Sequence, residues 1–192
     1  MRRAVLAAAS LALLVPLAAC DNKAEEKPSA AAAATSANGT LAAAVSGAPG
    51  LTTVATALKS TGLSSVFDGS APYTLLAPDD DAFGALGEAG KTLQSPENGA
   101  ALAEILRDHI LPGYLTVADI EAALKKAGGK PVTMKTMGGK SVSFVREGEA
   151  LVVSTPDGAR AKVDGAAVSA TNGVVIPLDA VLRKLPGSAG AT

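Results

Sequence analysis

The sequence predicts one α+β domain, with helices mainly in its first half and strands mainly in its second half. Apolar residues recur at helical spacing up to Gly129, and short β-rich runs alternate with glycine turns beyond it. Residues 39–186 carry this pattern, and about 150 residues is a usual size for one domain. The core must consist mostly of Val, Leu, Ile and Ala, because the chain has 3 Phe and no Trp.

The helices are predicted from apolar spacing and from the residues that start or stop them. Asp79, Asp80 and Asp81 precede the apolar Phe83, so we expect their carboxylates to bond the free N–H groups at a helix start. Thr116 is placed to cap a later helix, which Gly128-Gly129 stops. The expected helical segments are Leu51 to Ser60, 63–67, 98–108 and 117–127.

The strands are predicted from short runs rich in β-branched residues between turn residues. One run, Tyr73 to Ala77, lies among the helices between two prolines. The others follow Gly129, where Gly138-Gly139 reads as a hairpin turn. These later strands are expected over residues 132–136, 141–145, 151–153, 161–163, 167–168 and 174–176.

The first residues resemble the signal of a bacterial lipoprotein. Arg2 and Arg3 precede an apolar run, and Leu17-Ala18-Ala19-Cys20 fits a lipobox, in which small residues precede a cysteine. The run is shorter than the roughly 18–20 residues that a spanning helix needs. An uncleaved anchor and an ordinary secretory signal are the alternatives. We expect residues 1–19 to be the signal peptide, 20–38 a flexible tether that begins at lipidated Cys20, and 187–192 a disordered tail.

Several function classes find no support in the sequence. The net charge of −1 gives no electrostatic footprint for nucleic acid. No nucleophile elbow is present, and Gly139-Lys140-Ser141 lacks the first glycine of a phosphate-binding loop. Asp79 and Asp81 begin like a calcium loop, but later positions supply no oxygens. With one His and one Cys, a zinc site is not expected. We expect a monomer with no catalysis, metal or cofactor.

Three segments resemble, in order, the motifs of fasciclin domains. Residues 74–83 resemble the first motif, T-x-F-A-P-x-x-x-A-F. Residues 105–113 resemble the central segment that contains histidine, and residues 172–182 resemble the second motif, N-G-V-I-H-V-I-D-x-V-L. The matching residues, for which we expect mainly structural roles, are Thr74, Ala77, Pro78, Phe83, His109, Pro112, Gly113, Asn172, Gly173 and Asp179.

The resemblance implies a wedge of β-strands with helices packed around it, in an extracytoplasmic module associated with adhesion and matrix interaction. This chain departs from the family pattern at several positions. Leu76 replaces a usual Phe, and Ile176-Pro177 replaces a usual His-Val. Asp108 stands where many animal members have Tyr before the histidine, so integrin adhesion is not carried over. We expect His109 to be buried and to bond Thr74, Asn172 or Asp179.

The expected function is that of an adhesion or interaction module, exported from the cytoplasm and tethered to a membrane of the bacterial cell envelope. Acylated Cys20 would join it to the lipid bilayer of the inner or outer membrane. Its other partner would be an envelope protein or polysaccharide, and not nucleic acid. The alternative is an envelope protein that holds a small apolar ligand between helices and sheet.

Overall fold

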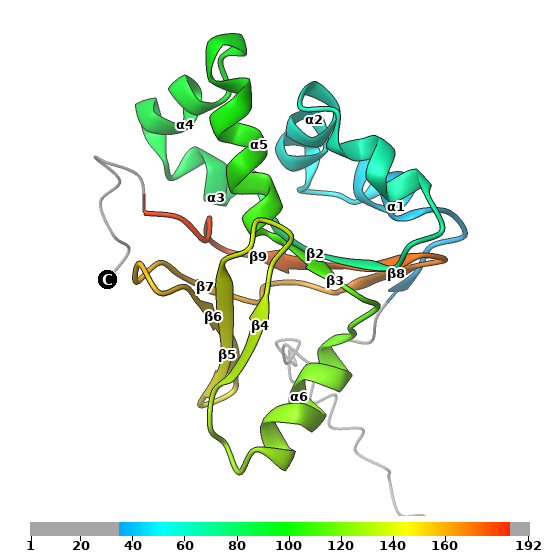
Figure 1. The fold of residues 1–192 in the computed structure, drawn as a ribbon, viewed down its shortest axis with the longest axis vertical. Coiled ribbons are helices and arrows are strands. Elements are labelled where there is room, and N and C mark those ends of the chain that lie inside the picture. Colours follow the sequence, from blue (N-terminus) through cyan, green and yellow to red (C-terminus); the bar gives the residue numbers. More distant parts are fainter. Residues whose placement is uncertain (1–34, 185–192) are drawn as a thin grey trace, which may run out of the picture.

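The computed structural model describes residues 35–184, which form two β-sheets with helices packed around them (Figure 1). The larger sheet has the strand order β1-β8-β9-β2-β3 and the smaller one the order β4-β5-β6-β7. The first contains β1 (Thr35–Ser36), β8 (Val168–Ala170), β9 (Gly173–Leu178), β2 (Tyr73–Pro78) and β3 (Ile110–Pro112). The second contains β4 (Val132–Lys135), β5 (Ser141–Glu147), β6 (Ala150–Ser154) and β7 (Arg160–Lys162).

The centre of the larger sheet joins the first and last thirds of the domain. β2 pairs in parallel with β9 over six residues and antiparallel with β3. Both central strands are almost entirely buried, as expected for strands that are covered on both faces. Side chains alternate between two cores. Leu75 and Val175 face the helical core, whereas Leu76 and Ile176 face the core shared with the smaller sheet.

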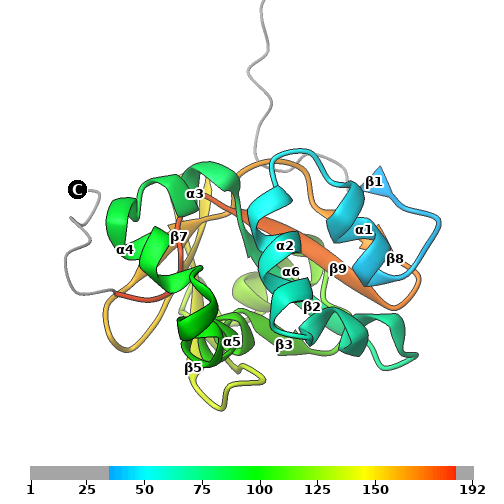
Figure 2. The same ribbon diagram turned by 90° about the horizontal axis from the view of Figure 1, so that it is seen from above.

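The helices before β3 cover one face of the larger sheet, and α6 (Val117–Lys126) lies at the other end of the molecule with the smaller sheet (Figures 1 and 2). The first group consists of α1 (Leu41–Gly47), α2 (Thr52–Ser60), α3 (Asp80–Gly84), α4 (Gly87–Leu93) and α5 (Gly99–Asp108), with 3-10 turns η1 (Leu63–Asp68) and η2 (Pro96–Asn98). The predicted α+β class, with helices mainly first and strands mainly second, is therefore confirmed.

Side-chain caps fix where several helices begin. Asp79 caps α3, because its carboxylate accepts from the Ala82 N–H at 2.6 Å. Asp80 instead accepts from the Thr53 N–H at 2.7 Å, at the start of α2, and this bond lowers the pKa of Asp80. Thr116 and Asp119 form a reciprocal capping box on α6. The expected capping role is thus confirmed for Asp79, whereas Asp80 stabilises a helix other than its own.

Four α-helices or β-strands escaped prediction. The Ala-rich α1, the Gly-containing α4 and the three-residue β3 each offer too short an apolar pattern for detection. β1 falls within residues 20–38, the segment expected to be a tether. It pairs in parallel with β8, whose free edge supplies the backbone hydrogen bonds. The larger sheet therefore includes residues before the expected domain start at residue 39, while residues 1–34 and 185–192 lie outside the described range.

Candidate functional site

The three motif segments, far apart in the sequence, lie side by side in the larger sheet. The first forms β2 and α3, the central one ends α5 and forms β3, and the last forms β9 and the turn before it. Polar side chains at this junction bond backbone groups of other elements. We call the group of Thr74, His109, Asn172 and Gly173 the motif centre.

Thr74 ties the loop after β3 to the middle of the sheet. Its side chain is buried within β2, where Oγ1 donates to the Gly113 carbonyl at 2.9 Å. The same oxygen accepts from the Leu115 N–H, also at 2.9 Å. Gly113 has a φ of 104°, which favours glycine, and its N–H donates to Pro72. Thr74 therefore holds the turn that leads toward α6.

Asn172 joins three segments near the N-terminal end of the domain. Its Oδ1 accepts from the Leu41 N–H at 2.7 Å, at the first residue of α1. Its Nδ2 donates to the carbonyls of Phe67 at 2.8 Å and Gly69 at 2.5 Å. The amide thus uses both its acceptor and its donors on buried or partly buried backbone groups.

Gly173 is required by the space around it. It is the first residue of β9, and the turn before it is formed by Thr171 and Asn172. A Cβ at Gly173 would lie 2.2 Å from the Tyr73 carbonyl oxygen and 2.9 Å from Leu41 Cδ2. Close approach of neighbouring backbones therefore excludes a side chain here.

The remaining motif residues lie in the core or at strand ends. Ala77, Pro78 and Phe83 are buried, whereas Pro112 is exposed at the end of β3. Asp179 links the two sheets, because its Oδ1 accepts from the Lys162 N–H at 2.6 Å and its own N–H donates to the Lys162 carbonyl.

His109 follows the last turn of α5 and is 1% exposed. Its Nε2 accepts from the Leu182 N–H at 2.9 Å, so the ring proton lies on Nδ1, which donates to the Ile105 carbonyl at 2.8 Å. The expected partners Thr74, Asn172 and Asp179 were wrong, although Leu182 belongs to the same last motif. Burial lowers the pKa of His109 below its ordinary value, which keeps the imidazole neutral.

Asp108 lies beside His109 in an ion-pair cluster. The carboxylate is 3% exposed, and its Oδ2 accepts from Lys140 Nζ at 2.7 Å and from Arg183 Nη1 at 3.4 Å. Glu104 also pairs with both cations, which lower the pKa of its carboxyl. Two carboxylates balance two cations, so the cluster offers no excess charge to an anion. It lines a pocket of about 490 Å³ together with the β6–β7 turn.

Comparison with known proteins identifies the fold. Residues 49–184 match the family model described as the fasciclin domain. This chain belongs to the fasciclin domain family. Protein sll1483 of Synechocystis sp. is 32% identical to it over 153 residues, which cover 78% of this chain and 76% of that protein. The solved FAS1 domain pair from the insect cell adhesion molecule Fasciclin I superposes with a TM-score of 0.66 at 18% identity. That match covers 76% of this chain and 51% of the insect chain, so this chain spans about half its length.

Asp108, the residue before the motif histidine, is not accessible to a binding partner in this fasciclin domain. Asp108 is buried under Lys140 and Arg183, so it does not offer a side chain to a partner. Its Oδ1 has no hydrogen-bond partner among the described residues. This atom packs against Gly138, where a Cβ would lie 2.2 Å from it. The carboxylate therefore joins α5, the β4–β5 hairpin and the segment after β9.

No pattern in the sequence points to the cations of this cluster. Lys140 lies in the run Gly139-Lys140-Ser141, which fails as a phosphate-binding loop, and Arg183 follows directly after the last motif. Gly138-Gly139 was correctly predicted as a hairpin turn, with a φ of 82° at Gly139. The need of Gly138 to accommodate a buried carboxylate appears only when α5 and the hairpin are seen together.

The described residues offer little for catalysis. Within residues 35–184, no group of three or more His, Cys, Asp or Glu side chains is placed to hold a metal ion. Both ring nitrogens of His109 are used by backbone groups, so the imidazole has no free atom to activate a nucleophile. In the same range, no helix is both long and apolar enough to cross a bilayer.

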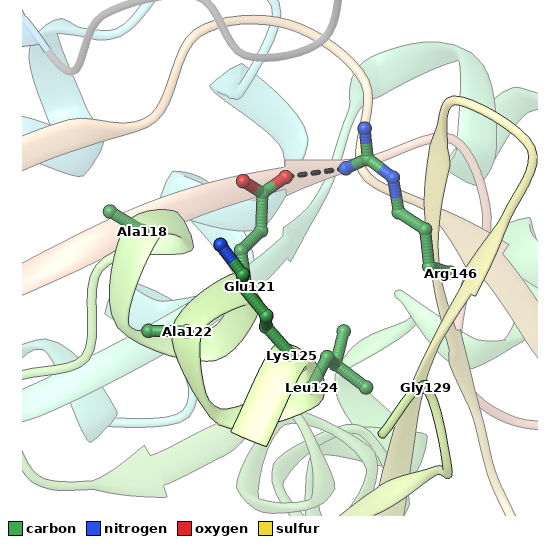
Figure 3. A pocket seen from close by; sticks show the side chains of 7 residues that line it. All are labelled: Ala118, Glu121, Ala122, Leu124, Lys125, Gly129 and Arg146. Atoms are coloured by element: carbon green, nitrogen blue, oxygen red, sulfur yellow. Dashed lines mark hydrogen bonds and ion pairs between the residues drawn. The ribbon is translucent and has the colours of Figure 1, made fainter. Parts of the chain in front are cut away.

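A groove of about 480 Å³ runs along one side of α6 (Figure 3). Ala118, Ala122 and Leu124 give it an apolar lining, which Glu121, Lys125, Gly129 and Arg146 complete. Glu121 of α6 forms an ion pair with Arg146 of β5 across it. The alternative expected from the sequence is an apolar ligand between helices and sheet, with no residues named, and this groove lies between α6 and β5 of the smaller sheet. Its elements, α6 and β5, come from outside the three motifs.

Proposed function

We propose that this chain is a non-catalytic fasciclin interaction module, held at a membrane of a bacterial cell envelope by acylated Cys20. Its partner would be an envelope protein or a surface polysaccharide. The observation that carries the proposal is that the polar side chains of the motif centre of this fasciclin domain are buried and bonded within the fold. Thr74, His109 and Asn172 bond backbone groups of the fold, which supports binding by an outer surface rather than chemistry at the motifs.

The tether is supported by the sequence before Cys20. A basic start, an apolar run and small residues before the only cysteine fit a lipoprotein signal. Two or more acyl chains hold a protein stably to a bilayer, whereas one holds it marginally. These residues lie outside the described range, so the tether depends on sequence alone.

The tether is tested by changing Cys20 to Ser in cells that process lipoproteins. The variant should lose incorporation of labelled palmitate, and it should either leave the membrane fraction or accumulate as an uncleaved precursor. Asn22→Ser, two residues further on, is the control that should behave like the parent. If Cys20→Ser is cleaved and stays bound to the membrane like the parent, the tether is wrong.

Binding of a small apolar ligand is the second candidate, and the groove beside α6 is the observation that favours it. Native mass spectrometry of the domain purified from envelope extracts tests this candidate. A ligand that stays bound to the parent and is lost from an Ala122→Asp variant would support it. Parent protein that carries only its covalent lipid would argue against it.

A further inference from the structure

Three lysines gather where α6 ends. Lys125 and Lys126 are the last residues of α6, and Lys130 follows the turn through Gly128 and Gly129. All three are exposed, and none has an ion-pair partner within residues 35–184. We call this group the lysine end. Its charges are therefore free to meet an external anion.

The charge of the domain is distributed unevenly along its longest axis. Lys125, Lys126 and Lys130 gather where α6 ends, although Asp119 and Glu121 lie earlier on the same helix. Residues 60–104, which include α3 and α4 at the opposite end of the molecule, contain seven Asp or Glu and one Lys (Figure 1). An anionic surface would attract the lysine end and repel the far end.

The groove beside α6 opens next to these lysines. Ala118 and Ala122 are exposed along it, and Lys125 belongs both to the groove and to the lysine end. Glu121 also lines the groove, but it is paired with Arg146, so Lys125 is the lining charge without an ion pair among the described residues. An apolar surface beside such lysines matches the boundary of an anionic bilayer, where phosphate groups lie above acyl chains.

We propose that the lysine end and the adjoining groove dock onto a bilayer that contains anionic phospholipid. The lysines would meet lipid phosphates, and the groove would take the apolar part of a lipid. This inference rests on the proposed tether. Fifteen positions separate Cys20 from Thr35, which reach at most about 50 Å when extended, so this end of the domain can reach the membrane.

Because of the tether, a weak contact between the lysine end and the lipid is enough to orient the domain. Lysines near an anionic surface together raise membrane partitioning by on the order of 100-fold for three residues, which is modest for a free protein. An anchored domain is already held at high effective concentration, so such a contact would orient it. The expected result is an anchored module with its acidic helical end directed away from the lipid.

Acetylation of lysines in the reconstituted full mature chain tests this orientation. The protein is placed in vesicles of phosphatidylcholine with or without phosphatidylglycerol, pulsed with an amine acetylating reagent and analysed by mass spectrometry. Lys125, Lys126 and Lys130 should react several-fold more slowly in the anionic vesicles only. At 1 M salt, where the Debye length is about 3 Å, this protection should disappear. Lys59, Lys91 and Lys162 are internal controls and should react alike in both vesicles.

A variant in the groove distinguishes docking through the groove from general electrostatic attraction of the domain to the vesicle. Ala122→Asp places a carboxylate in the groove and should abolish the protection. Ala101→Asp, at an exposed position of α5, should leave it intact. Equal reaction of the lysine end in both vesicles, or an equal change at all six lysines, would overturn the proposal. So would protection by a soluble anionic polysaccharide without protection by vesicles.

Flotation of the same samples distinguishes failure of the tether from failure of the docking face. A chain that does not float with phosphatidylcholine vesicles is not anchored, and the proposed tether is then wrong. Flotation of that chain with anionic vesicles alone, lost in Lys125→Gln/Lys126→Gln/Lys130→Gln, would still support the docking face. Absence of flotation with either vesicle would overturn the tether and, with it, the docking that rests on the tether.

Discussion

The motif centre and the lysine end of α6 differ in what their polar groups bond. Thr74, His109 and Asn172 bond backbone groups from distant segments, and their side chains are buried. Lys125 and Lys130 are exposed and make no ion pair within the described residues. The residues by which the family is recognised therefore maintain the fold, and a binding surface is better sought where the sequence lies outside the motifs.

The largest effect is expected from Gly173→Ala. The added Cβ meets the Tyr73 carbonyl at 2.2 Å, and this backbone lies in a central strand that cannot move aside. We expect a loss of more than about 4 kcal/mol in unfolding free energy, or failure to fold. Gly47→Ala is the control, because its Cβ meets no atom within 4 Å at the end of α1. Comparable chemical denaturation curves for the two variants would contradict the close-approach argument.

The next effect is expected from Asn172→Ala, which removes three hydrogen bonds to backbone groups. Leu41, Phe67 and Gly69 would lose their partner, and we expect a loss of about 3 kcal/mol. Asn98→Ala removes bonds at the surface and should cost less than about 1 kcal/mol. Thermal unfolding of both variants measures the difference. Equal losses of stability would contradict the claim that Asn172 contributes more to the fold than a surface asparagine does.

A smaller effect, dependent on pH, is expected from His109. Burial lowers its pKa in the folded state, so the unfolded chain binds the extra proton first as pH falls. Stability should be complete above the ordinary pKa of about 6.5 and should fall below it by up to about 1.4 kcal/mol per pH unit. Asp80 and Asp119, whose pKa values are lowered, lose their contributions only at more acidic pH. Urea unfolding of the parent should show this slope between pH 7 and 5.

His109→Gln supplies the control for that slope. The variant should be less stable at pH 7, because the two ring hydrogen bonds are lost or weakened, but its stability should not change between pH 7 and 5. A parent whose stability is flat over this range would mean that His109 titrates alike in the folded and unfolded states.

The smallest effect is expected at the lysine end. Lys125→Gln/Lys126→Gln/Lys130→Gln should change stability by no more than about 1 kcal/mol, since it removes only favourable charges near a helix C-terminus. Lys59→Gln/Lys91→Gln/Lys162→Gln carries the same charge change elsewhere. A loss above about 2 kcal/mol in the first variant alone would assign the lysine end to the fold.

Local patterns predicted much of the fold. The helical spacing of Leu102, Ile105 and Leu106 predicted α5, and Thr116 with Gly128 bounded α6. Such signals act within a few residues of each other, so the sequence displays them. α1 carries mostly alanine, and β3 has three residues, so neither shows a readable period.

The candidate site was less predictable, because its contacts join distant segments. Motif resemblance identified His109 and Asn172, but it did not give their partners, which lie 73 and 131 residues away at Leu182 and Leu41. Asp108 was recognised as a departure from the family pattern, yet its burial under Lys140 depends on how the hairpin meets α5. Contacts of this range are set by packing of whole elements.

Measuring the protonation state of His109 is the most direct test of the claim that the motif centre is buried and bonded within the fold. It is the one histidine of the chain, so long-range ¹H–¹⁵N spectra of the imidazole report on it without ambiguity. The hydrogen bonds to Ile105 and Leu182 predict a neutral ring with its proton on Nδ1 at pH 7, unchanged at pH values just below 6.5. A ring protonated on Nε2, or one that titrates with an ordinary pKa, would contradict the account, because it would show an imidazole free to meet a ligand.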